Sequence, residues 1–179
     1  MTREIISYEQ ALALKGYRSE QDSLAHFDKA RSLFEGIKTC AIEGIVRTTI
    51  YLACHALLEQ NAAIRFTLLW IALECLFGLE HVPAETTFRI SQRMALFLEE
   101  DKDKRHVLFG QIKKSYEWRS KIVHGLRLKK VADNDSQDLL LELETFVRRS
   151  LVAILQKKSM IETFDGKGGE KCLDGLAYA

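Results

Sequence analysis

Residues 61–78 read NAAIRFTLLWIALECLFG and contain the most apolar run of the chain. Asn61 is a suitable N-terminal cap and Gly78 a suitable stop, so the pattern predicts one helix between them. A helix that is apolar on nearly every side must be enclosed by other helices, because each of its faces has to be shielded from water. This stretch therefore predicts the central helix of a bundle.

The segments on either side also carry helical patterns. The chain has 179 residues, 47% of them hydrophobic, with a single proline and ten glycines, which suits one core and argues against a sandwich or barrel. Apolar residues recur at helical spacing, and we expect helices over 21–36, 37–60, 85–100, 102–124 and 134–157, with a short one over 7–16. These patterns predict an all-α, antiparallel helical bundle with extra N-terminal helices.

The expected domain organisation has three parts. An N-terminal segment covers residues 1–20, the bundle covers 21–158, and a flexible tail covers 159–179, because glycine and polar residues are frequent there. The longest apolar run is interrupted by Glu74 and is shorter than the roughly 18 residues that a membrane span requires. We therefore expect no membrane association.

The spacing of the cysteines indicates whether the chain binds a metal and whether its thiols are oxidised. The chain has four cysteines, Cys40, Cys54, Cys75 and Cys172. They form no Cys-x-x-Cys pair and show no metal-finger spacing with histidine. We interpret them as reduced thiols of a cytoplasmic protein. Neither a metal site nor a cofactor is predicted.

Charge is distributed unevenly along the chain. The net charge of the whole chain is only +1, but residues 101–130 contain ten Lys or Arg and three acids. A basic stretch in an otherwise acidic chain points to a phosphate-bearing partner.

An arginine interrupts the inward seam of the helix predicted over 102–124. Steps of three and four residues place Arg119 on the same face as several apolar residues: Leu108, Ile112, Ser115, Ile122 and Leu126. Arginine is rarely buried without a partner. An anion must therefore approach Arg119, either a carboxylate of the protein or the phosphate of a ligand.

His124 follows five residues later, directly before Gly125, and Tyr116 and Ser120 share its stripe of the helix. Five helical steps leave His124 roughly 140° around the helix from Arg119. The two side chains can converge if the helix unwinds at Gly125, or across a two-fold pair of such helices. For His124, the alternative interpretation is a charge that complements the helix dipole. For Tyr116 and Ser120, it is packing or local hydrogen bonding.

The segment YEWRSKIVHG, residues 116–125, resembles the signature of HEPN domains, especially the abortive-infection-associated (Apea-like) branch. That signature is an arginine, four to six residues and a histidine, often with a polar residue after the arginine, which here is Ser120. Residues 65–76, RFTLLWIALECL, and residues 93–98, RMALFL, are similar to the same branch. The resemblance covers about residues 41–155.

The resemblance implies a four- to five-helix bundle, frequent dimerisation and, in many members, RNA cleavage without a metal. It implies that Arg119 binds phosphate and His124 acts as the acid–base residue, with Ser120 and Tyr116 in support. The expected substrate is RNA, for which tRNA loops are the natural candidate, and a homodimer is expected. Many members belong to phage-defence or toxin–antitoxin systems, so an antitoxin or sensor partner is a further expectation. The alternative is a non-catalytic nucleotide- or RNA-binding module, or an oligomerisation domain.

Two further predictions concern charged residues. Glu74, an acid in the apolar run, needs a partner, and we expect Arg93, or else Arg89, to form a structural ion pair with it. Lys121, Arg127 and Lys129 are candidates for contacts with a nucleic-acid backbone, although a solvated surface explains them equally well.

Overall fold

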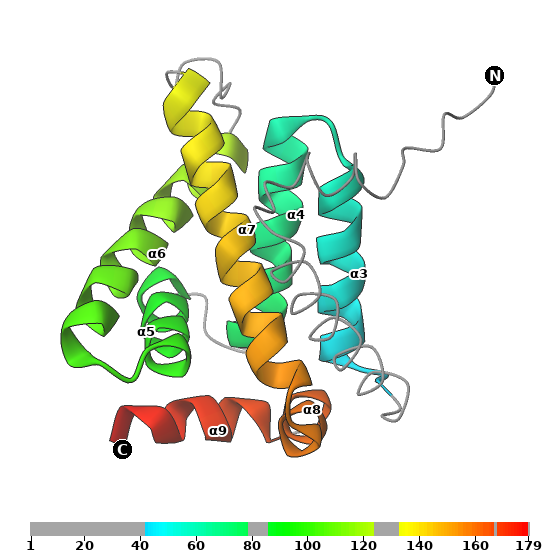
Figure 1. Cartoon of the computed structure of the whole chain (residues 1–179), viewed down its shortest axis with the longest axis vertical. Coiled ribbons are helices and arrows are strands. Elements are labelled where there is room, and N and C mark those ends of the chain that lie inside the picture. The colour runs from blue at the N-terminus through cyan, green and yellow to red at the C-terminus, as the bar shows by residue number, and fades with distance from the viewer. Residues whose placement is uncertain (1–41, 79–85, 124–132, 167, 179) are drawn as a thin grey trace, which may run out of the picture. The chain divides into compact units, whose positions relative to one another are not determined.

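The computed structural model describes residues 42–78, 86–123, 133–166 and 168–178, and it confirms an all-helical bundle. The chain divides into two compact units, residues 1–39 and 40–179, and all described residues belong to the second. Figure 1 shows its helices: α3 (Ile45–Leu58), α4 (Ala62–Phe77), α5 (Thr86–Leu98), α6 (Lys102–Val123), α7 (Asp133–Leu155), α8 (Lys158–Asp165) and α9 (Gly169–Gly175), followed by the 3₁₀ turn η2 (Leu176–Tyr178). The helices predicted over 7–16 and 21–36 lie outside the described residues.

Helix α4 is the centre of this unit, as its apolar sequence predicts. The Asn61 side chain accepts hydrogen bonds from the backbone N–H groups of Ala63 and Ile64 at 3.0 and 3.3 Å, which caps the helix. At its other end, a Cβ atom at Gly78 would lie 2.3 Å from the carbonyl oxygen of Glu74, so only glycine fits there. Trp70 is fully buried on this helix.

Helices α3, α6 and α7 all contact α4, and α5 joins α6 in a hairpin (Figure 1). Helix α3 runs antiparallel to α4 through a short connection, whereas α7 runs in the same direction as α4. The α5–α6 turn is held by Arg105, which donates to the carbonyl oxygens of Glu99 and Glu100 at 3.1 and 3.2 Å. Asp101 caps α6 by accepting from the Lys104 N–H at 2.9 Å. Among the described residues, no helix has both the length and the apolarity of a membrane span.

The C-terminal segment differs from the flexible tail expected over 159–179. Residues 158–165 and 169–175 form α8 and α9, and Ile161, Phe164 and Leu173 are buried in the core. The ring of Phe164 meets the rings of Phe77 and Phe97 edge-on, with centroids 6.5 and 5.7 Å apart. Because glycines and charged residues dominate this segment, its three spaced apolar residues did not suggest helices. Their burial nevertheless makes the segment part of the bundle.

Helix α8 also caps α3. The Asp165 carboxylate accepts hydrogen bonds from the backbone N–H of Val46 at 2.8 Å and of Glu43 at 3.3 Å. This contact explains why α3 begins after Gly44, whereas the sequence pattern predicts a helix from residue 37. A Cβ atom at position 44 would lie only 3.1 Å from the Asp165 carboxylate.

Arg93 links α5 to the end of α4 and to α9, and not to Glu74 as expected. Its side chain is 4% exposed, and its guanidinium donates to Asp174 at 2.7 and 3.0 Å and to Glu170 at 3.3 Å. It also donates to the carbonyl oxygens of Phe77 and Gly78 at 3.3 and 3.1 Å. A cation is favourable at this helix C-terminus. The predicted Glu74–Arg93 pair is wrong, because the acids of the supposed tail bind Arg93.

Replacement of Phe164 tests whether the C-terminal segment stabilises the bundle. Phe164→Ala removes a buried ring that meets two other rings, so we expect a loss of about 3–5 kcal/mol in unfolding free energy. Tyr178→Ala is the control, because Tyr178 is 93% exposed, and it should change stability by less than about 0.5 kcal/mol. Urea unfolding followed by circular dichroism measures both. Equal stability of the two variants would mean that the segment is not part of the core.

Candidate functional site

Arg119 and Glu74 form an ion pair between α6 and α4. The Nη2 atom of Arg119 lies 3.1 Å from Oε1 and 3.1 Å from Oε2 of Glu74. The side chains are 26% and 24% exposed, so the pair is neither buried nor fully solvated. The seam predicted on α6 is present, with Leu108, Ile112, Ser115 and Ile122 buried along it. Of the two anions expected near Arg119, a carboxylate of the protein is the one observed.

Tyr116 completes a cluster around this carboxylate. Its ring stands edge-on to Trp70, with centroids 5.1 Å apart, and the guanidinium carbon of Arg119 lies 5.7 Å from the centre of the Tyr116 ring. Burial raises the pKa of the Tyr116 hydroxyl, and the nearby charge of Glu74 raises it further, against the opposing charge of Arg119. The phenol therefore stays protonated beside the Glu74 carboxylate.

Buried polar atoms without partners gather at the same helix interface. Among the described residues, Trp70 Nε1, Ser115 Oγ and Arg119 Nε are buried and have no hydrogen-bond partner. Such groups usually find partners in an interior selected for stability alone. The fourth such atom, Arg65 Nε, belongs to a residue that pairs with Glu144 of α7, so three of the four lie on residues around the Glu74–Arg119 pair.

The outer face of α6 carries charged side chains. Lys113, Glu117 and Lys121 are exposed along one stripe. The ammonium of Lys121 lies 4.7 Å from the centre of the Trp118 ring, a cation–π contact. Lys121 therefore remains available at the surface, next in the chain to the half-buried Arg119 and Ser120.

Three predicted site residues, His124, Arg127 and Lys129, lie outside the described residues, because the description of α6 ends at Val123. Within the described ranges, no three His, Cys, Asp or Glu side chains are grouped so that they could hold a metal ion. Comparisons with protein-family models, with curated proteins and with solved structures find no match for this chain.

The Glu74–Arg119 contact is the feature of the site that sequence reasoning missed. Glu74 is the only acid in residues 61–78, and Arg119 is the only cation on the inward seam of α6. Each of these charges needs a partner of opposite sign inside the bundle. Their isolation in two apolar surfaces was the sequence signal for this ion pair. The partners expected for Glu74, Arg89 and Arg93, both lie on α5, whereas Arg119 lies on α6.

A double-mutant cycle measures this ion pair. Arg119→Met and Glu74→Gln should each lower the unfolding free energy by roughly 1–3 kcal/mol, between the values typical of surface and buried pairs. The double variant should lose less than the sum, because the interaction is removed only once. The exposed pair Lys158–Glu162, with side chains 71% and 65% exposed, is the control and should show little coupling. Strictly additive effects at Glu74 and Arg119 would refute the pairing.

Cys75 provides a chemical test of the same carboxylate. Burial raises the pKa of the Cys75 thiol, and the charge of Glu74 raises it further. Because the thiolate is the reactive form, iodoacetamide at pH 8 should modify exposed Cys54 well before Cys75. Glu74→Gln should accelerate alkylation of Cys75, since it removes one cause of the raised pKa. Peptide mass spectrometry reads both rates, and equal rates in the parent protein would contradict the prediction.

Proposed function

We propose that this chain is a metal-independent endoribonuclease of the HEPN type, with Arg119 as the phosphate-binding residue and His124 as the acid–base residue. The observation that supports the proposal is that the Arg119 guanidinium is partly exposed and only partly hydrogen-bonded. It is one-quarter exposed, and Glu74 engages only its Nη2 atom. No described residue accepts a hydrogen bond from Nη1.

The chemistry needs few groups. The 2′-hydroxyl of a ribose attacks the adjacent phosphorus, and the bond from phosphorus to the 5′-oxygen breaks, leaving a 2′,3′-cyclic phosphate and a free 5′-hydroxyl. A histidine with a pKa near its usual value of about 6.5 can accept the first proton or donate the second. A guanidinium in a fixed position stabilises the charge that gathers on the phosphate oxygens.

Glu74 and Tyr116 are the positioning residues in this proposal. An arginine side chain is flexible, and its restriction costs conformational entropy. The Glu74 carboxylate and the ring of Tyr116 restrict the guanidinium before substrate arrives, so less of that cost falls on binding. Glu74 also offsets part of the charge of Arg119, and the basic residues of 101–130 supply the attraction for RNA. Ser120 is a further supporting residue, and Lys121, Arg127 and Lys129 contact the backbone of the nucleic acid.

The proposed substrate is RNA, with tRNA loops as the first candidate, and the proposed assembly is a two-fold dimer. The dimer resolves the angle of roughly 140° between positions 119 and 124 on a regular helix, because Arg119 of one copy can then serve His124 of the other. A role in phage defence or in a toxin–antitoxin system, with an antitoxin or sensor as partner, belongs to the same proposal. So does a cytoplasmic location.

One observation favours the second candidate, a non-catalytic RNA- or nucleotide-binding or oligomerisation module. Arg119 already has an anionic partner within its own chain, which is what a purely structural ion pair requires. In that case the cluster of Glu74, Tyr116 and Arg119 only joins α4 to α6.

RNA cleavage in the presence of EDTA tests the proposal. The purified protein should cleave total RNA in EDTA and leave 2′,3′-cyclic phosphate ends. His124→Ala should lower the rate by about 10²–10⁴-fold while changing stability by only about 0.3–1 kcal/mol. Arg119→Lys keeps the charge but loses the planar fork, so cleavage should fall with it. Mixing the His124→Ala and Arg119→Lys chains should restore part of the activity if two copies share each site.

His106→Ala is the matched control, because His106 is an exposed histidine near the other end of α6, and it should cleave like the parent. Cleavage that disappears in EDTA and returns with magnesium or zinc would overturn the mechanism. So would a His124→Ala variant that cleaves at the parent rate. RNA binding that requires Arg119, without cleavage by any variant, would establish the binding module instead.

A further inference from the structure

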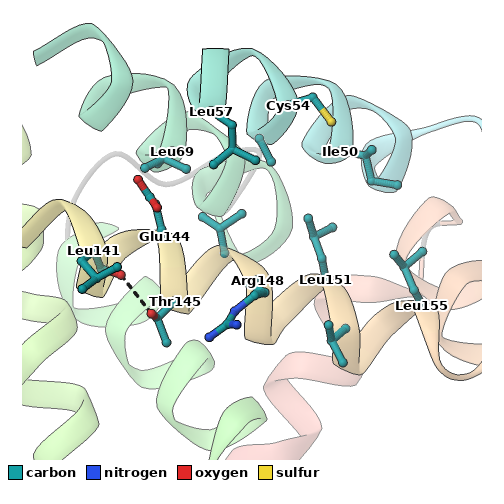
Figure 2. A pocket seen from close by; sticks show the side chains of 13 residues that line it. Ile50, Cys54, Leu57, Leu69, Leu141, Glu144, Thr145, Arg148, Leu151 and Leu155 are labelled. Carbon is teal, nitrogen blue, oxygen red and sulfur yellow. Dashed lines mark hydrogen bonds between the residues drawn. The ribbon is translucent and has the colours of Figure 1, made fainter. Parts of the chain in front are cut away.

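An apolar groove lies between α3 and α7 (Figure 2), and none of Glu74, Tyr116 and Arg119 lines it. It has a volume of about 440 Å³, and α4 contributes Leu69 to its wall. Ile50 and Leu57 of α3 face Leu151 and Leu155 of α7 across it. Pockets that hold small ligands have volumes of roughly 300–1,000 Å³, so this groove can accommodate one.

The groove leaves large aliphatic side chains exposed to water. Leu57 is 59% exposed and Leu141 is 64% exposed, although both belong to helices with well-buried faces. Exposed aliphatic groups that adjoin one another in a concave surface usually mark a binding site. No aromatic side chain is among the residues that line the groove, which suits a flexible aliphatic chain better than a flat ring.

The polar groups of the groove narrow the choice of ligand. The Thr145 hydroxyl donates to the carbonyl oxygen of Leu141 at 2.9 Å, and Glu144 forms an ion pair with Arg65. Arg148 is exposed, and no described residue pairs with it. Arg148 stands at the edge of the groove with its guanidinium pointing away from α3 (Figure 2), so a ligand meets aliphatic walls and one cation at the rim.

We propose that this groove binds a free single-chain fatty acid, with the aliphatic tail between α3 and α7 and the carboxylate against Arg148. An Arg–carboxylate contact is strong because two parallel hydrogen bonds reinforce the charge attraction. The volume suits one aliphatic chain better than the two chains of a membrane phospholipid. This site is independent of the proposed nuclease function and uses none of its residues.

Alkylation of Cys54, which lines the groove, reports on its occupancy. Decanoate, added below its micelle concentration, should slow the reaction of Cys54 with iodoacetamide at least tenfold at saturation. Cys172 on α9 lies outside the groove and is the internal reference, whose rate should not change. Decanol, which has the same chain length without the charge, should bind about tenfold more weakly, since a hydrogen bond to a charged group contributes about that factor.

Two variants separate the tail contact from the charge contact. Ala53→Trp should fill the groove and abolish decanoate binding, whereas Ala62→Trp, at an exposed position of α4, should not. Arg148→Gln should weaken decanoate about tenfold and leave decanol unchanged, and Arg47→Gln, an exposed cation of α3 outside the groove, should have no effect.

Three outcomes would overturn the proposal. The first is a Cys54 rate that decanoate does not alter, including the case in which Cys54 is already protected by a second copy or by another part of the protein. The second is equal binding of decanoate and decanol together with no effect of Arg148→Gln. The third is decanoate binding that survives Ala53→Trp. RNA cleavage by the parent protein has no bearing on any of these results.

Discussion

The apolarity of α4 is the constraint on which the rest of the structure depends. Its faces include Trp70, Leu73 and Phe77, all fully buried, and no single neighbour can cover them. Helices α3, α6 and α7 therefore surround it, and α9 also contacts it. The one acid of this helix, Glu74, cannot remain unpaired in such a wall. The position of α6, with Arg119 beside that carboxylate, satisfies both requirements.

Features set by local sequence could be predicted well. The ends of α4 follow from Asn61 and Gly78, because a cap and a stop depend on the chemistry of neighbouring residues. The buried seam of α6 follows from spacing alone. All-helical architecture follows from the same periodicity.

Features set by long-range pairing could not be predicted from the pattern. Glu74 and Arg119 are separated by 45 residues, so their contact depends on how α4 and α6 pack and not on spacing along the chain. The C-terminal segment was misjudged because three buried residues in about twenty give a weak signal beside glycines and charges. The error at Arg93 has the same origin, since its partners lie in that segment.

The burial of Arg93 restricts the order in which Arg93 and its acidic partners can be replaced during evolution. Its guanidinium is almost fully buried, whereas Asp174 and Glu170 are 51% and 54% exposed. Removal of the carboxylates leaves a buried charge without its counter-ions, which is costly, while removal of the arginine leaves two acids that water can solvate. Among related sequences, loss of the cation should therefore precede loss of the acids. Lineages that kept arginine at this position should also have kept an acid on the facing turn of α9.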